Sequence, residues 1–273
     1  MKLGGSLFVV SLLVLLGCEG EWVGGTLGKT ACDLRNFNGF YTAVKMSADR
    51  DNLYILDNSS KVHFYKRDNL YECSFDFEYT YHFNGFLDDV FSLGNTFYVQ
   101  DKASLKSRED VTLCDARDGS FAIYGNELAV GSNMGIETWS INSCTKTGNV
   151  SSWKVLSLAA TSSDYFAAEG ISAEPRNLAM YSKSGASYSD PMSITPGNEK
   201  NFCSADRLVA NNHGVYLLDK TCKKIGVYDN RAVWRKSISL DSLGIRGVLD
   251  IAPAEYSYIF ILHSGGVEKV NVF

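Results

Sequence analysis

The tetrapeptide Phe-Asn-Gly-Phe occurs twice in this chain of 273 residues, at 37–40 and at 83–86, so the two copies begin 46 residues apart. Each copy is followed by an apolar stretch, a polar turn and a second, stronger apolar stretch, which starts near Leu53 and near Phe97. Segments rich in β-branched and aromatic residues and bounded by Gly, Asn, Asp and Ser are typical of β-hairpins. The recurrence predicts a protein made of repeated β units.

Later segments follow the same order, so that the sequence contains six similar units. Their strong apolar strands are anchored at Leu53, Phe97, Leu128, Phe166, Leu208 and Ile259. The anchors are about 41 residues apart on average, which matches the four-stranded blade of a β-propeller. We therefore predict an all-β protein, a β-propeller with six blades of four antiparallel strands. A seven-bladed ring and a β-sandwich of similar-looking strands stay open as alternatives.

The cysteines favour the propeller over the sandwich because they recur in step with the units. Four of them follow an anchor by 14 to 20 residues, namely Cys73, Cys114, Cys144 and Cys222. This spacing places each near the expected turn into an outermost strand.

The two ends of the repeat region indicate how the ring closes. The last unit ends at Phe273 after a third strand, while the segment Ala31–Leu34 reads as an outermost strand with no blade of its own. We expect this N-terminal segment to supply the missing strand of the sixth blade, because closure covers exposed strand edges. Each Phe-Asn-Gly-Phe would then link an outer strand to the next inner strand. Gly39 and Gly85 would permit the turn, and the phenylalanines would pack between blades.

The strand Asn-Leu-Tyr-Ile-Leu-Asp at 52–57, followed by Lys-Val-His-Phe-Tyr at 61–65, resembles the units of NHL and related six-bladed propeller families. The resemblance covers roughly residues 32–273 and is clearest in the first two units. It implies the same fold that the spacing predicts.

The N-terminus has the features of a secretory signal. Lys2 supplies a positive charge, and the apolar run Leu7–Leu16 is too short to span a bilayer comfortably. The run ends in Leu-Leu-Gly-Cys, which resembles the lipobox of bacterial lipoproteins and implies cleavage before Cys18 and lipidation of Cys18. Glu19 follows where an inner-membrane lipoprotein tends to carry Asp, so the resemblance implies the outer membrane. A plain signal peptide and an uncleaved anchor are the alternatives.

These features predict three parts: a lipoprotein signal peptide at 1–17, a tether at 18–31 and the propeller at 32–273. The mature chain would keep six cysteines besides Cys18, an even number that permits three disulfides in an exported protein. Cys203 and Cys222 flank one unit and are predicted to form a disulfide. No pair has the Cys-x-x-Cys spacing of a zinc or redox site, so we expect no metal and no cofactor.

The positions four residues after each anchor are the candidates for ligand binding. They should end the second strand of each blade and lead into loops near the mouth of the channel. The candidate set is Asp57, Asp101, Asn212 and His263. The alternative is that such side chains cap their own turns. Asp88 and Asp89 form an acidic pair on a link between blades, either solvated or able to bind a cation or act as acid and base.

No catalytic motif stands out in the sequence. A net charge of −5 and a pI of about 5.4 argue against nucleic acid as a partner. We expect a lipid-anchored, non-enzymatic binding or scaffold module for a protein or glycan in the bacterial envelope. An envelope hydrolase or lyase for polysaccharide or a lactone-like substrate is the alternative. It would require the candidate acids and His263 to converge on one site. In a third possibility, a structural subunit, the side of the propeller makes the contact.

Overall fold

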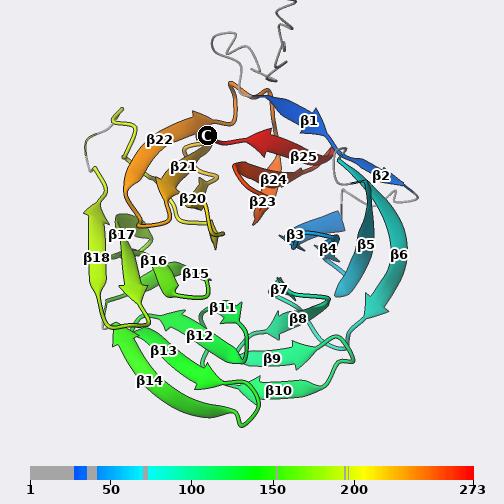
Figure 1. Cartoon of the computed structure of the whole chain (residues 1–273), viewed down its shortest axis with the longest axis horizontal. Helices are drawn as coiled ribbons and strands as arrows, with labels where there is room; N and C mark the ends of the chain where they lie inside the picture. The colour runs from blue at the N-terminus through cyan, green and yellow to red at the C-terminus, as the bar shows by residue number, and fades with distance from the viewer. Residues whose placement is uncertain (1–27, 36–41, 70–72, 152, 194, 196) are drawn as a thin grey trace, which may run out of the picture.

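The computed structural model describes residues 28–35, 42–69, 73–151, 153–193, 195 and 197–273. In this part of the chain six β-sheets stand side by side around a common axis (Figure 1). In every sheet the four strands nearest the axis run antiparallel to their neighbours. The protein is therefore a six-bladed β-propeller, which confirms the predicted fold class and the number of blades.

Blades one to three each contain four consecutive strands, which follow one another from the innermost outward. Blade one has β3 (Ala43–Ala48), β4 (Asn52–Asp57), β5 (Lys61–Asn69) and β6 (Ser74–His82). Blade two has β7 (Asp89–Leu93), β8 (Thr96–Asp101), β9 (Ser104–Ser107) and β10 (Thr112–Asp115). Blade three has β11 (Ser120–Tyr124), β12 (Glu127–Ser132), β13 (Gly135–Ser140) and β14 (Thr145–Ser151).

Blades four and five repeat this plan, whereas blade six takes strands from both ends of the chain. Blade four has β15 (Val155–Ala160), β16 (Asp164–Ile171), β17 (Glu174–Ser182) and β18 (Ser187–Pro191). Blade five has β19 (Arg207–Ala210), β20 (Gly214–Asp219), β21 (Lys224–Asp229) and β22 (Trp234–Ser239). Blade six has β23 (Val248–Pro253), β24 (Tyr258–His263), β25 (Gly266–Asn271) and β1 (Lys29–Ala31).

The core lies between neighbouring blades, and the second strands are buried on both faces. Every residue of β4 is buried, and its successive side chains point to opposite neighbours. Ile55 belongs to a cluster with Phe260 of blade six. Tyr54 packs against Phe97 of blade two, with ring centroids 5.0 Å apart. Each such side chain contributes roughly 1.5–3 kcal/mol of burial free energy, so blade-to-blade packing holds the ring together.

The N-terminal segment closes the ring, as predicted, but it is divided between two blades. β1 pairs antiparallel with β25, with Lys29 opposite Val270, and so completes blade six. The next strand, β2 (Asp33–Arg35), pairs in parallel with β6 and becomes a fifth strand of blade one. The predicted single strand Ala31–Leu34 is therefore split at Cys32. The propeller includes β1, which lies before the boundary predicted at Cys32.

The second Phe-Asn-Gly-Phe lies where it was predicted, on the link from β6 to β7. Gly85 has φ +95°, a left-handed conformation that favours glycine. Phe83 is buried and packs edge-on against Phe97 at 6.2 Å. Phe86 differs from the prediction, because 64% of it is exposed. The first copy lies outside the described residues.

Candidate functional site

Three of the four candidate ligand residues lie at the predicted place in the fold. Asp57 ends β4, Asp101 ends β8 and His263 ends β24. These strand ends lie level with the starts of the innermost strands, since Asp57 is opposite Ala43 in the register of blade one.

Asn212 lies elsewhere, because the fifth unit was anchored on the wrong strand. Leu208 belongs to β19, the innermost strand of blade five, so Asn212 falls in the turn between β19 and β20. The residue that ends β20 is Asp219, which is fully buried. Both strands carry apolar runs of similar length, and the sequence pattern does not distinguish them. Because Leu208 is on the first strand and not the second, Cys222 lies in the β20–β21 turn and not, as predicted, next to an outermost strand.

Three of the second-strand ends cap their own turns. Asp57 Oδ1 accepts hydrogen bonds from two backbone N–H groups of the following turn, at 2.8 and 3.0 Å. Asp219 Oδ1 accepts one from the backbone of Cys222 at 2.8 Å, and His263 Nδ1 accepts one from Gly265 at 3.2 Å. Burial alone would raise the pKa of Asp57, but these hydrogen bonds outweigh it and hold the pKa below its usual value. The geometry thus gives these positions the capping role that was the alternative interpretation.

The acids that an enzyme would bring together have separate partners. Asp101 forms an ion pair with Lys106, 2.8 Å from its Nζ, beside the Phe-Asn-Gly-Phe link. Asp88 Oδ2 accepts a hydrogen bond from the backbone N–H of Lys102 at 2.7 Å. Asp89 begins β7 and its side chain is only 12% exposed. The acidic pair is therefore split between a turn and the interior.

Asp89 belongs to a buried cluster of charges that the sequence did not reveal. Arg207 begins β19 in blade five and forms an ion pair with Asp89 of blade two, across the ring. Its Nε lies 3.6 Å from Asp250 Oδ1 of blade six. The other oxygen of Asp250 accepts a hydrogen bond from the backbone N–H of Met46 in blade one at 2.9 Å. The cluster thus brings four blades together.

The electrostatics of this cluster favour the charged guanidinium. Burial alone would lower the pKa of Arg207, but the negative charges of Asp89 and Asp250 outweigh burial and raise it above its ordinary value. Asp250 is fully buried, and Arg207 and the backbone of Met46 lie against its two oxygens. The cluster joins blades across the axis at the end where the innermost strands begin.

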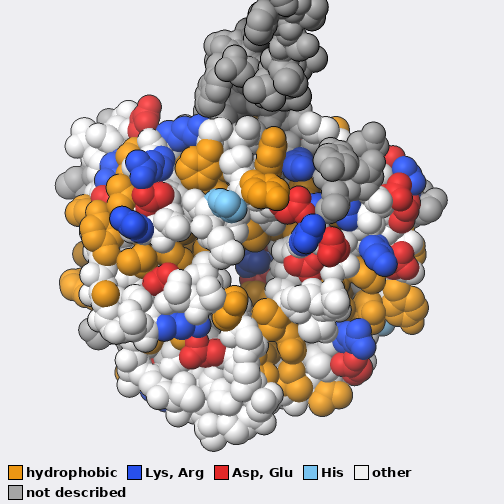
Figure 2. All heavy atoms as spheres, in the orientation of Figure 1, with side chains coloured by type: hydrophobic (Ala, Val, Ile, Leu, Met, Phe, Trp, Pro, Cys, Tyr) orange, Lys and Arg blue, Asp and Glu red, His pale blue; other side chains and the backbone are white. Residues whose placement is uncertain are grey.

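A hollow opens at the opposite end of the channel. Its cavity of about 320 Å³ is lined by Arg207 at the start of β19 and by Asn211 just after the end of that strand, so it runs along the whole strand. Most of its wall consists of small and apolar side chains of the innermost strands. Figure 2 shows this face of the ring hollowed at its centre, with charged side chains at depth.

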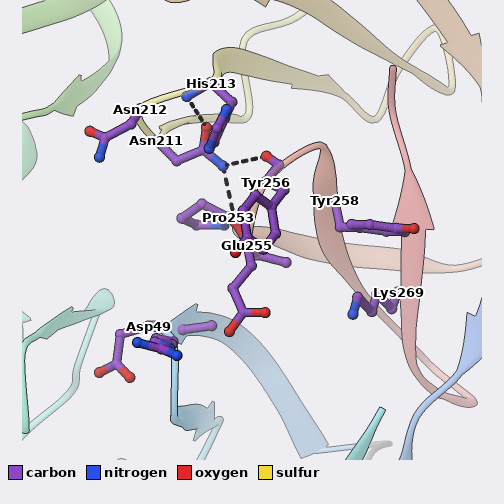
Figure 3. Close-up of a pocket in the computed structure, with 12 residues that line it drawn as sticks. Asp49, Asn211, Asn212, His213, Pro253, Glu255, Tyr256, Tyr258 and Lys269 are labelled. Carbon is purple, nitrogen blue, oxygen red and sulfur yellow. Dashed lines mark hydrogen bonds between the residues drawn. The ribbon is translucent and has the colours of Figure 1, made fainter. Parts of the chain in front are cut away.

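A side pocket of about 790 Å³ adjoins the channel mouth between blades five, six and one. The two cavities share the wall residues Ala48, Asp49, Asn211, Asn212 and Pro253. Figure 3 shows His213 and Tyr256 together on one side of the pocket and Asp49 across from them. Asn212 therefore lines both the side pocket and the channel cavity. It lies on the face of the ring opposite to that of Asp57, Asp101 and His263.

Asn211 holds the two turns of the side pocket together. Its Oδ1 accepts hydrogen bonds from the backbone of His213 and Gly214 at 2.8 and 3.0 Å. Its Nδ2 donates to the carbonyl oxygen of Ala254 in the next blade at 3.0 Å. The turn of blade six carries Tyr256, whose ring centroid lies 5.7 Å from that of His213.

Tyr256 is presented to solvent by an unusual backbone. Its φ is +54°, a region that a bulky side chain seldom adopts, and 69% of the residue is exposed. On the same rim, Lys269 Nζ lies 4.6 Å from the ring centroid of Tyr258, and burial lowers the pKa of this lysine. Rings, amides and a cation at one mouth can bind a ligand by stacking and hydrogen bonding.

Three disulfides lie in the described part of the chain. They pair Cys32 with Cys73, Cys114 with Cys144 and Cys203 with Cys222, with Cα atoms 4.5, 4.9 and 5.7 Å apart. Among the described residues, one group has ligand atoms close enough to share a metal ion: Cys203, Asp219 and Cys222. In the disulfide form the sulfurs are bonded to each other, and Asp219 accepts backbone hydrogen bonds from both cysteines. The group is therefore a crosslinked turn.

No protein-family model matches the sequence, and no curated protein matches it. Solved structures do share its fold. The virginiamycin B lyase of Staphylococcus aureus superposes with a TM-score of 0.59 at 9% identity, over 91% of this chain and 99% of that one. PorZ, an essential surface component of the type-IX secretion system of Porphyromonas gingivalis, gives 0.51 at 8% identity, over 90% of this chain. This chain spans only 39% of PorZ. These likenesses show the fold alone.

BamB of Moraxella catarrhalis is also similar, with a TM-score of 0.48 at 10% identity over 87% of this chain and 85% of that one.

Cys18, the predicted lipidation site, lies outside the described residues. Among the residues that are described, there is no helix with the length and apolar character needed to cross a membrane.

Proposed function

We propose that the chain is a non-enzymatic binding or scaffold module of the bacterial envelope, anchored through lipid on Cys18. Its ligand, a protein segment or a glycan, would enter the side pocket and the channel mouth. The observation that carries this proposal is the exposed ring of Tyr256 on a strained turn, next to His213 and above a cavity of about 790 Å³. Strained backbone of this kind often marks a ligand site.

The division of polar groups between the two ends of the channel supports binding at this mouth. The charged groups at the far end, Arg207, Asp89 and Asp250, are paired with one another. At the mouth, Asn212 and Tyr256 are exposed on turns that Asn211 fixes. Preorganised turns reduce the entropy that a binding surface loses when a ligand is bound.

The disulfides support export. All six cysteines of the propeller are paired, and such bonds persist in oxidising compartments outside the cytosol. This agrees with a secretory signal before Cys18. A lipid on one residue gains roughly 0.8 kcal/mol for each buried CH₂ group, so acyl chains there would hold the propeller at a membrane surface.

An affinity pull-down from envelope extracts tests the proposal. The lipidated chain should recover a partner protein or cell-wall glycan, and Tyr256→Ala should lose it. Tyr79→Ala is the matched control, because this tyrosine is 58% exposed on β6, the fourth strand of blade one from the axis. The Cys18→Ala variant should no longer be found in the membrane fraction but should still bind the ligand. Recovery of the same ligand by Tyr256→Ala as by the unmodified chain would reject this mouth as the site.

An envelope hydrolase or lyase is the second candidate function. The feature that favours it is the pair of carboxylates Asp89 and Asp250 on either side of Arg207. Polysaccharide turnover that Asp89→Asn abolishes and Tyr256→Ala leaves intact would favour an enzyme over the binding module.

A further inference from the structure

A second cavity, away from the channel mouth, lies on the side of the ring between blades three and four. Its volume is about 760 Å³, and its walls come from β14, Trp153, and the strands β16, β17 and β18. None of the residues predicted from the sequence lies in it. Cavities of several hundred Å³ match small-molecule and oligosaccharide ligands in size.

The floor of this groove is a fixed polar network around Glu169. This carboxylate is only 2% exposed. Its Oε1 accepts hydrogen bonds from the Tyr181 hydroxyl and, at 3.2 Å, from Ser151. Its Oε2 accepts one from Asn177 Nδ2 at 2.7 Å. Burial, followed by the bond to Glu169, raises the pKa of Tyr181 to about 12, so the phenol remains a donor at physiological pH.

The network leaves polar groups facing the groove. Ser189 accepts a hydrogen bond from Asn177 at 2.9 Å and retains its own O–H for a ligand. Asn177 also brings a side-chain carbonyl oxygen, and Ser187 and Asn149 add further donors and acceptors to the lining. Sugar hydroxyls, which both donate and accept, are suited to such a mixed set.

Two aromatic residues rise beside this polar floor. Trp153 on the link between the blades is 65% exposed, and Tyr188 on β18 is 43% exposed. Exposed rings next to a polar floor provide the apolar faces on which the C–H face of a sugar ring packs. Arg176 also lines the groove and is paired with Glu174 at 2.6 Å, whereas the group held at the floor is the carboxylate of Glu169. A carboxylate at the floor disfavours an acidic sugar.

We propose that the groove between blades three and four binds a neutral oligosaccharide. Trp153 and Tyr188 stack on the sugar rings, and the network around Glu169 orients the hydroxyls. This site is separate from the side pocket at the channel mouth, so it can be tested without reference to the ligand proposed there.

Isothermal titration of the mature chain with cellotetraose, maltotetraose and tetra-N-acetylchitotetraose tests the site, with a hyaluronan tetrasaccharide as the acidic probe. At least one neutral probe should bind, and Trp153→Ala should raise its Kd about tenfold or more. Tyr188→Ala should also weaken binding. Tyr79→Ala, which removes an exposed ring on β6 that lines neither cavity, should leave the Kd unchanged.

Three outcomes would overturn the assignment. They are no binding of any neutral probe, an unchanged Kd in Trp153→Ala, and binding of the acidic probe as tight as that of the neutral ones. Because Trp153 is exposed, its substitution should leave the unfolding transition in place, which circular dichroism checks.

Discussion

Arg207 connects its own blade to two others. It lies at the start of an innermost strand, yet its guanidinium reaches Asp89 across the ring and Asp250 in the next blade. A buried ion cluster adds little net stability compared with apolar packing, but removing one partner leaves the others buried and unpaired. Substitution of Arg207 is therefore expected to lower the stability of the fold strongly.

We predict that Arg207→Met lowers the free energy of unfolding by about 3–5 kcal/mol, because Asp89 and Asp250 lose their counter-charge. Urea denaturation at neutral pH measures the change. Arg235→Met is the matched control, since its ion pair with Asp229 is on the surface, and the change should stay within about 1 kcal/mol. Equal losses in the two variants would contradict the role given to the cluster.

We also predict that Asp57→Ala costs about 1–2 kcal/mol at pH 7, since the carboxylate caps the β4–β5 turn. The folded pKa of Asp57 lies below its unfolded value, so its contribution is complete above the unfolded pKa and is lost as pH falls through the folded pKa. The stability difference between wild type and variant should therefore shrink as the pH is lowered below about 4. A difference that stays constant down to about pH 2 would show that the charged carboxylate is not responsible.

At the scale of strands, the ring depends on how its two ends meet. β1 pairs with β25, and β2 pairs with β6. Cys32 lies between β1 and β2, and its disulfide with Cys73 fastens the chain at the junction of blades six and one. It also closes a longer loop than Cys203–Cys222, with 41 against 19 residues of separation.

Replacing both Cys32 and Cys73 by Ser should cost about 2–5 kcal/mol, because the unfolded chain gains freedom and the seam loses its crosslink. The Cys203→Ser, Cys222→Ser variant should lose less, since the loop is shorter. Parallel urea titrations in non-reducing buffer compare the two. A smaller loss at the seam than in blade five would contradict the importance of the closure.

The strands were largely predictable because their signals are local. Apolar runs, turn residues and the second Phe-Asn-Gly-Phe each occupy a few consecutive residues, and they indicated the blades and the closing N-terminal strand. The error in blade five was local as well: Leu208 and Val215 both begin apolar runs, and only pairing shows which belongs to the second strand.

The whole molecule determines what single strands cannot. Arg207 and Asp89 are 118 residues apart in the chain, so no sequence pattern places them in one cluster. The same holds for the side pocket, where turns from three blades meet around Asn211. The ring thus has one end crossed by ion pairs and one end open, and the binding role proposed for this protein belongs to the open end.

Photo-crosslinking in intact cells tests that role most directly. A benzoylphenylalanine in place of Tyr256 would lie on the rim of the open mouth, and one in place of Tyr79 would lie on β6, the fourth strand of blade one from the axis. We predict a discrete crosslinked species, protein or glycan, from position 256 and none of the same mass from position 79. Crosslinks from position 79 alone, or the same product from both positions, would contradict binding at the channel mouth.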